Sequence, residues 1–231
     1  MKHIGIAAIS AEGASLLYKT IVHESGRRFG AYIHPEISLH AFSFSKYREC
    51  KEQDRLELWS KLLLESANKL AQAGAEFFVC TSNTNHLVFD KVTNYSLLPI
   101  PWLHIAQPVL QTAKQKGLLT LGLMGTTVTM TSKIYEPVLE SAGIKILTPN
   151  ATEMNTLNSI IYSELVQGIF RAESIAKLLE IESSLRERGC DGIILGFTEL
   201  PIVMTEQNTS LPLLDSTRLL GIGALEYACQ V

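Results

Sequence analysis

The feature that most constrains the fold of this chain is an internal repeat, in which residues of the first half recur 117 positions later. Each copy has the pattern of a strand, a turn and the start of a helix. A second set of matches, at a spacing of 115, aligns residues 74–76 with 189–191, and each trio leads into an apolar run that ends in a polar turn. Because the motifs keep their order, we interpret the chain as two similar lobes and not as a solenoid of short repeats. The pairs at the first spacing are Gly5 with Gly122, Ala8 with Gly125, Ser15 with Ser132 and Tyr18 with Tyr135.

Short apolar runs rich in β-branched residues predict buried strands. Amphipathic stretches between them predict helices, most clearly over residues 55–73 and 173–188. This alternation is typical of an α/β fold with mainly parallel sheets. The predicted strands are Ile4–Ala8, Ile37–Phe42, Phe77–Cys80, Trp102–Ile105, Leu119–Met124 and Gly192–Leu195.

Two proline-containing segments mark the passages between the lobes. The segment Pro99–Pro101 resembles a crossover, and the stretch Glu206–Pro212 resembles the return, after which a last helix over 217–229 rejoins the first lobe. We therefore expect a first lobe of residues 1–98 plus 209–231 and a second lobe of residues 99–208.

Charge and composition exclude several classes of function. Twenty Lys and Arg against 23 Asp and Glu give a net charge of -3, which argues against nucleic acid as a partner. The apolar opening stops at Ser10, well short of the roughly 20 residues of a membrane span, so neither a membrane partner nor a secretory signal is expected. The four cysteines lack C-x-x-C spacing, which favours reduced thiols and a cytoplasmic location.

Known cofactor motifs are absent from the sequence. The six histidines are dispersed, and none pairs with a cysteine or carboxylate at metal-ligand spacing. Neither the Gly-x-Gly-x-x-Gly pattern nor a phosphate-binding loop occurs, so the sequence predicts no metal and no nucleotide.

Four polar turns follow predicted strands. In open α/β sheets small ligands bind beyond the carboxyl ends of the strands, where helix N-termini offer free N–H groups. Each turn by itself is explained by helix capping, whereas together they would line a cleft between the lobes with donors suited to a carboxylate. The turns are Ser10, Ser82-Asn83-Thr84, Gly125-Thr126-Thr127 and Thr198-Glu199.

These motifs, in this order, resemble the cofactor-independent aspartate/glutamate racemase family, which includes broad-specificity amino-acid racemases and hydantoin racemases. The resemblance covers nearly the whole chain. It implies two lobes related by a pseudo-twofold axis, a homodimer, and an amino acid held between the lobes without pyridoxal phosphate. The segments that carry it are Ile4-Gly5-Ile6, Asn83-Thr84 with His86, Leu103-His104-Ile105-Ala106, Gly125-Thr126-Thr127-Val128-Thr129-Met130 with Tyr135, and Leu195-Gly196 with Thr198-Glu199.

The same resemblance exposes a departure at the two catalytic positions. Stereoinversion needs one group that removes the α-proton and another that delivers a proton to the opposite face. The family uses two cysteines, one before Asn-Thr and one before Thr-Glu, and this chain has Ser82 and Phe197 there. A phenyl ring transfers no proton, and a serine hydroxyl is a poor base unless a neighbour activates it. Cys80 would lie deeper along its strand, so it could replace a lost thiol only for a shifted ligand, whereas Cys190 would lie toward the opposite end of the sheet and cannot serve. For both, a buried cysteine acting as a small apolar residue is the simpler interpretation.

Other side chains could take part in the site. Glu199 is a general acid or base, or a partner for a ligand ammonium, unless it merely complements a helix dipole. His86 and His104 either reach the cleft or pack within the lobe. Family members acting on acidic substrates often carry Lys where this chain has Val166, so a preference for aspartate or glutamate is not expected.

The sequence thus predicts a member of this isomerase family that binds a small amino acid or carboxylate and has lost two-thiol racemisation. One alternative is an inactive binding protein that serves as a sensor or partner. Others are residual racemisation through Ser82 and a second acid or base, and single-proton chemistry such as decarboxylation or cis–trans isomerisation.

Overall fold

The computed structural model describes residues 1–52, 55–95 and 98–230, and it divides into two compact units. Unit 1 comprises Met1–Gln107 and Leu220–Val231, and unit 2 comprises Pro108–Leu219. Each unit is a four-stranded, fully parallel sheet with helices, so the predicted α/β class with two similar lobes is confirmed.

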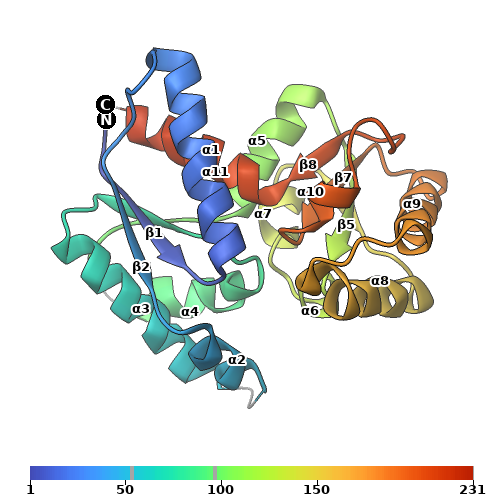
Figure 1. The fold of residues 1–231 in the computed structure, drawn as a ribbon, viewed down its shortest axis with the longest axis horizontal. Coiled ribbons are helices and arrows are strands. Elements are labelled where there is room, and N and C mark those ends of the chain that lie inside the picture. The colour runs from blue at the N-terminus through green and yellow to red at the C-terminus, as the bar shows by residue number, and fades with distance from the viewer. Residues whose placement is uncertain (53–54, 96–97, 231) are drawn as a thin grey trace. The chain divides into compact units, whose positions relative to one another are not determined.

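The sheet of unit 1 has the order β2-β1-β3-β4 (Figure 1). Its strands are β1 (Ile4–Ala8), β2 (Ile37–Ala41), β3 (Phe77–Cys80) and β4 (Trp102–Leu103). The apolar runs predicted these strands because β1 and β3 are buried along their whole length. The helical segments are α1 (Ala11–Phe29), α2 (Phe44–Glu52), α3 (Leu56–Gln72), the 3₁₀ turn η1 (Thr84–Val88) and α4 (Phe89–Tyr95). Helix α5 (Ala106–Lys116) begins in unit 1 and passes into unit 2 at Pro108, and α11 (Ser216–Cys229) returns to unit 1 at Leu220.

The sheet of unit 2 has the equivalent order, β6-β5-β7-β8. Its strands are β5 (Thr120–Gly125), β6 (Lys145–Leu147), β7 (Gly192–Gly196) and β8 (Leu213–Asp215). In both sheets the first strand of the unit lies second and pairs with the strand that the 115-residue match aligns. The helical segments are α6 (Thr127–Thr131), α7 (Glu136–Glu140), α8 (Ala151–Ser163), the 3₁₀ turn η2 (Leu165–Gln167), α9 (Ala172–Glu187) and α10 (Leu200–Val203).

The repeat extends to the packing around two matched glycines. A Cβ atom placed on Gly5 would lie 3.1–3.2 Å from the Cβ atoms of three side chains, and one placed on Gly122 would meet three side chains at 2.6–3.5 Å. The neighbours correspond one to one at the 115-residue spacing. Because the strand lies this close to its neighbours, a side chain at either position would force those neighbours to shift. The corresponding neighbours are Leu70 and Leu185, Ala75 and Cys190, and Phe78 and Ile193.

The borders between the units lie later in the chain than the proline-containing segments suggested, because a short strand extends each sheet. Strand β4 pairs with β3, so the first sheet continues past residue 98. Strand β8 pairs with β7, so the second sheet continues past residue 208. The compact units accordingly exchange at 107/108 and 219/220, about ten residues later than the sequence suggested at each border.

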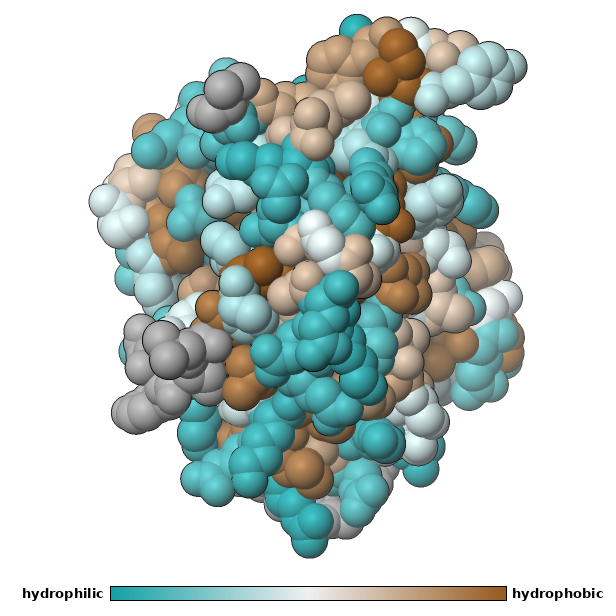
Figure 2. Space-filling model, turned by 90° about the vertical axis from the view of Figure 1, so that its left-hand side faces the viewer, coloured by the Kyte–Doolittle hydropathy of each residue, from teal (hydrophilic) through white to brown (hydrophobic). Residues whose placement is uncertain are grey.

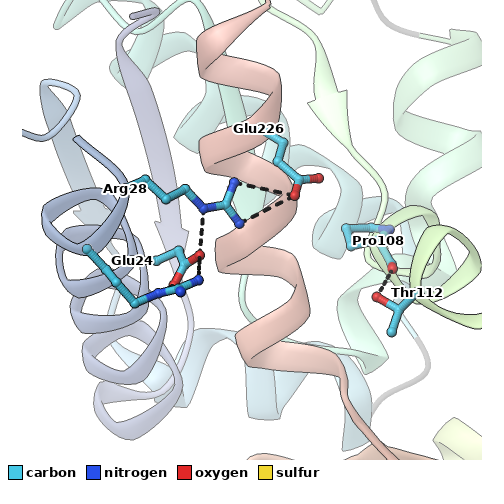
Figure 3. A network of polar contacts seen from close by, with 6 residues as sticks. Glu24, Arg28, Pro108, Thr112 and Glu226 are labelled. Carbon is cyan, nitrogen blue, oxygen red and sulfur yellow. Dashed lines mark hydrogen bonds and ion pairs between the residues drawn. The ribbon is translucent and has the colours of Figure 1, made fainter. Parts of the chain in front are cut away.

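Helices α1 and α11 of unit 1 are held together by a close approach and an ionic network. A Cβ atom on Gly221 would lie 3.0 Å from Thr20 Cγ2, so glycine allows the two helices to pack closely. Arg28 Nε donates to Glu24 Oε1 at 2.5 Å, and its Nη2 lies 3.5 Å from Glu226 Oε1 (Figure 3). Hydrogen bonds from Arg27 and Arg28 lower the pKa of Glu24 to about 2. The network therefore links the last helix to α1 in addition to their close packing.

Candidate functional site

In unit 1, the predicted site residues follow three neighbouring strands. Ser10 follows β1 and caps α1, where its Oγ accepts a hydrogen bond from the N–H of Gly13 at 3.2 Å. Residues 82–84 follow β3, and His104 follows β4. Because these strands are parallel neighbours in the order β1-β3-β4, their carboxyl ends share one edge of the sheet. The fold thus brings the predicted residues of unit 1 together.

Ser82, which the family resemblance places at the first cysteine position, has no activating partner among the described residues of its own unit. Its side chain is half-buried, and its Oγ forms no hydrogen bond to any residue described in unit 1. Cys80, two residues earlier, is fully buried, and burial raises the pKa of its thiol to about 12. The thiol nearest to Ser82 in the sequence is therefore protonated at neutral pH and poorly suited to proton abstraction.

His86 and His104 form part of an aromatic cluster behind this turn. His86 Nδ1 lies 3.0 Å from the carbonyl oxygen of Ser82, and its Nε2 accepts a hydrogen bond from the N–H of Ile105 at 3.2 Å. Both ring nitrogens thus bond to the backbone, and burial lowers the pKa of His86 well below its usual value. A ligand would have to displace one of these bonds to bind the ring.

His104 lies edge-on to its neighbours in the same cluster. Its ring centroid is 4.8 Å from that of His86 and 4.5 Å from that of Phe89. Its Nδ1 accepts from the N–H of Ala106 at 3.1 Å, so the ring caps the start of α5. Burial lowers the pKa of His104 to about 4, which keeps the ring neutral at physiological pH. Nε2 is the ring nitrogen that this cap leaves to other contacts.

In unit 2, glycines bring α6 against the ends of two strands. A Cβ atom on Gly125 would lie 3.0 Å from the carbonyl oxygen of Gly196, and one on Gly196 would lie 3.1 Å from Thr129 Cγ2. Thr126 caps α6, with its Oγ1 accepting from the N–H of Thr129 at 3.2 Å. The N–H of Thr127 donates to Asn158 Oδ1 at 2.9 Å. The turn after β5 is therefore fixed by its own helix and by α8.

The turn after β7 corresponds to the turn after β3. At the 115-residue spacing Phe197 matches Ser82, and Thr198 and Glu199 match the two residues that follow. Phe197 is half-buried and carries no acid or base. The Thr198 hydroxyl donates to Glu199 Oε2, and the Glu199 side chain does not cap the short helix α10. Because β5 and β7 are neighbours, this turn lies beside that of Thr126 and Thr127.

The structure adds polar residues that the sequence did not single out. Asn158 holds the backbone of the Thr127 turn. Ser216 follows β8 and donates to the carbonyl oxygen of Leu195 at 2.8 Å, beside the fully buried Tyr135, whose pKa is raised by burial. Strand β8 has three residues, too few for its apolar pattern to predict that a strand ends directly before Ser216, the first residue of α11.

Cys190 occupies a packing position at the amino end of β7. It stands where unit 1 has Ala75, and its Sγ would lie 3.5 Å from a Cβ atom on Gly122. Burial raises the pKa of the Cys190 thiol. Since the predicted site follows the carboxyl end of β7, Cys190 acts in this fold as a small apolar side chain.

Among the described residues, no group of three His, Cys, Asp or Glu side chains is placed to hold a metal ion. Within the same residues, no helix combines the length and the apolar character that a membrane crossing requires.

Comparisons with known proteins agree with this architecture. The family model "Asp/Glu/Hydantoin racemase" matches residues 6–220. The broad-specificity amino-acid racemase RacX of Bacillus subtilis is 23% identical over 161 residues, covering 70% of this chain and 68% of RacX. Two solved structures are each 31% identical over 100% of both chains. They are a proposed Asp/Glu racemase from Yersinia pestis, with a TM-score of 0.93, and an aspartate racemase homologue from Pyrococcus horikoshii OT3, with a TM-score of 0.86.

The family match spans both units, including the turns after β1, β3, β5 and β7. The chain therefore belongs to the Asp/Glu/Hydantoin racemase family.

Proposed function

We propose that this protein binds an amino acid or another small carboxylate between its lobes and does not catalyse two-thiol racemisation. One observation carries the proposal. The matched turns after β3 and β7 begin with Ser82 and Phe197, whereas racemisation by two thiols needs a cysteine at each position. Family membership supports the binding of a substrate-like ligand, and these two residues oppose the chemistry.

The remaining cysteines give no substitute for the missing pair. Cys80 and Cys190 are buried with raised thiol pKa values, and Cys50 is buried likewise. A thiol must be deprotonated to act as a base, and burial in apolar surroundings opposes this. Cys229 lies near the end of α11, and neither its location nor its sequence context relates it to the turns.

The proposed ligand cradle consists of polar groups at the carboxyl ends of the strands. Hydroxyl, amide and backbone N–H donors suit the carboxylate of an amino acid, and the Glu199 carboxylate suits its ammonium group. His86 and His104 support the turn after β3 from behind. The exposed Val166 replaces the lysine expected for an acidic side chain, which favours a ligand other than aspartate or glutamate. The proposed carboxylate partners are Ser10, Asn83, Thr84, Thr126, Thr127 and Thr198.

The alternative of single-proton or residual racemase chemistry rests on Glu199. Its carboxylate accepts a hydrogen bond from Thr198 in the turn that matches the turn of Ser82 in unit 1. A carboxylate in this place could exchange a proton on one face of a ligand. This chemistry would need neither a cofactor nor a thiol at either position.

Incubation in deuterated water with a panel of L- and D-amino acids tests the proposal. We expect no incorporation of α-deuterium beyond the buffer control, together with a rise in melting temperature on addition of at least one amino acid or small carboxylate. Rapid exchange by the unaltered protein would refute the loss of racemisation. Exchange abolished by Glu199→Gln but retained in Ser82→Ala would favour the Glu199 alternative.

We also propose that the protein is a cytoplasmic homodimer, as the family resemblance implies. The molecular mass of the full chain in solution tests the dimer, and this measurement is independent of any ligand.

A further inference from the structure

Strand β2 lies at the edge of its sheet and has no charged residue that would oppose pairing with another strand. β2 is the first strand in the order β2-β1-β3-β4, and its five residues carry no Lys, Arg, Asp or Glu. The N–H of Ile4 donates to the carbonyl oxygen of Glu36 at 2.9 Å. Because backbone groups alternate along a strand, those of residues 36, 38 and 40 face β1, and those of Ile37, Leu39 and Ala41 point outward. Such an exposed row of donors and acceptors invites pairing.

The matching edge of unit 2 differs. Strand β6 has three residues and begins with Lys145, so it is short and charged, as protected edge strands commonly are. Leu39, at the centre of β2, is 51% exposed. The two edge strands thus occupy equivalent places in similar sheets but differ in character. Strand β6 is short and charged, whereas β2 is longer and uncharged.

We propose that β2 pairs antiparallel with β2 of a second copy of this chain, with Leu39 on the twofold axis. The strand is complementary to itself in this register. Leu39 faces Leu39, Ile37 faces Ala41, and Ser38 faces His40 of the other copy. The outward backbone groups at residues 37, 39 and 41 then all form inter-strand hydrogen bonds. The apolar face of Ile37, Leu39 and Ala41 continues across the axis into its copy.

Charges at the two ends of β2 are complementary in the same register. Glu36, three residues before Leu39, faces Phe42, three residues after it in the other copy. Two ammonium groups lie over the Phe42 ring, Lys46 Nζ at 4.7 Å and Lys69 Nζ at 4.8 Å from its centroid. The Glu36 side chain is 79% exposed, with His3 Nδ1 3.9 Å away. Lys69 Nζ is already paired with Glu65 Oε1 at 3.0 Å, whereas no ion pair is formed by Lys46 among the described residues. Each end of the pair therefore brings the exposed Glu36 carboxylate to Lys46 and, beside it, to the paired Lys69.

Apolar side chains extend the surface beyond both ends of β2. Ile33 is 46% exposed before the strand, and Phe44 is 56% exposed after it. Antiparallel pairing about Leu39 brings the segment of Ile33 in one copy alongside the segment of Phe44 in the other. Figure 2 shows hydrophobic residues gathered at the end of this face where the chain passes from α1 to β2. In the proposed pair, an exposed Ile33 and an exposed Phe44 of the other copy would thus come to the same end, as apolar residues of an interaction surface do.

The mass of the unaltered chain and of Leu39→Lys, measured by sedimentation equilibrium, tests the proposal. We expect a dimer for the unaltered chain and a monomer for Leu39→Lys, because the variant places two ammonium groups on the axis. Leu119→Lys, a change at a 65% exposed leucine before β5, is the matched control and leaves the dimer intact. This inference rests on the proposed homodimer. A monomeric unaltered chain overturns both, whereas a dimeric Leu39→Lys overturns the β2 interface alone.

Disulfide trapping tests the register without weakening the interface. In a Cys229→Ser background, which removes the exposed native thiol, we expect Leu39→Cys to form a dimer linked by a disulfide on mild oxidation with diamide. Facing residues of a hydrogen-bonded antiparallel pair have Cα atoms about 5.5 Å apart, within the range of a disulfide. Ala41→Cys should not link, since its copies would lie about 14 Å apart at ~3.4 Å per residue. Equal linking of both variants, or of neither, overturns the register.

Charge reversal tests the ends of the strand. Glu36→Lys should raise the dissociation constant of the dimer at least about tenfold, because it faces two cations. Adding Lys46→Glu and Lys69→Glu to the same chain should restore dimerisation. Circular dichroism of each variant checks that the fold is retained. Failure of the triple variant to recover, with its fold intact, contradicts the proposed facing of Glu36 and Phe42.

Discussion

The two units agree at the amino ends of their strands and diverge at the carboxyl ends. At the amino ends, Gly5 and Gly122 meet the same three matched neighbours in each unit. At the carboxyl ends, the turn after β3 is supported by His86 and its aromatic neighbours, whereas the turn after β7 lies beside a close contact of glycines with Thr129. The contrast shows that the packing of the repeat is kept where it supports the sheet and altered where the proposed ligand would bind.

The largest expected effect comes from restoring the chemistry that both divergent turns lack. Ser82→Cys combined with Phe197→Cys should produce α-deuterium incorporation about 100-fold above the buffer control, since a positioned acid or base contributes roughly 10²–10⁴-fold. Nuclear magnetic resonance of the amino acid measures the exchange. Each single variant should exchange less, because only one face of the ligand then meets a thiol. A folded double variant without exchange would mean that the two turns do not share a ligand.

A smaller effect separates the units by their response to acid. All six histidines lie in unit 1, and burial lowers the pKa of His104 from 6.5 to about 4. The unfolded chain therefore binds this proton at a higher pH than the native chain does. Stability falls as the pH drops from 6.5 to about 4, by up to about 3 kcal/mol at 1.36 kcal/mol per pKa unit, and this contribution levels off below that range.

Tryptophan fluorescence resolves this prediction, since Trp59 and Trp102 both lie in unit 1. Urea unfolding followed by fluorescence reports unit 1, and its midpoint should fall between pH 6.5 and 4. Circular dichroism reports both units, and any unfolding transition that it detects and fluorescence does not belongs to unit 2. The midpoint of that transition should fall less over the same pH range. His104→Gln, which keeps an acceptor near the N–H of Ala106, is expected to flatten the pH dependence. An unchanged slope in this variant would assign the acid sensitivity to other groups.

The next effect tests the divergent carboxyl ends directly. Gly125→Ala places a Cβ atom 3.0 Å from the carbonyl oxygen of Gly196, a backbone atom that cannot rotate away. We expect a loss of about 1–3 kcal/mol in the free energy of unfolding, as for other overpacked sites. Unit 1 has Ala8 at the matched position, so a methyl group is already accommodated there. Urea unfolding of Gly125→Ala measures the loss, and a cost no larger than that of Ala8→Gly would contradict the difference.

Much of the fold could be predicted because the strands and long helices carry strong periodic patterns. The runs at β1, β3 and β7 and the amphipathic stretches at α3 and α9 are found within one or two residues of their predicted bounds. Strands β6 and β8 were missed, since three residues give too little pattern. The charged stretch of residues 46–55, for which the apolar pattern predicted no helix, is largely part of helix α2, and residues 53–54 lie outside the described residues.

The candidate site was predictable only in part. The turns after the strands could be located, because parallel strands end at a common edge. The bond from Thr127 to Asn158 could not, since it joins residues 31 positions apart that only the packing of α8 brings together. The sequence also could not show that both ring nitrogens of His86 bond to the backbone. It therefore could not decide whether His86 reaches the cleft or packs within the lobe. The ligand-binding roles remain predictions for the experiments above.

The smallest effect concerns matched carboxylates at the amino ends of the strands, where the two units agree. Asp191 accepts hydrogen bonds from the N–H groups of Leu119 and Thr120, at 2.7 and 3.0 Å, whereas Glu76 accepts one from the N–H of His3 at 3.0 Å. Each caps the strand that precedes its own in the sheet. Asp191→Ala should therefore cost about 1–2 kcal/mol and Glu76→Ala about half as much, at roughly 1 kcal/mol per hydrogen bond.

Chemical denaturation of both variants measures this difference, and Asp191→Asn is the matched control because its amide oxygen can still accept one of the two bonds. An intermediate cost for this variant is expected. If Glu76→Ala cost as much as Asp191→Ala, the number of capped amides would not determine the stabilisation. The matched ends of the sheets would then differ in some other way, such as the packing of the longer glutamate stem against its neighbours.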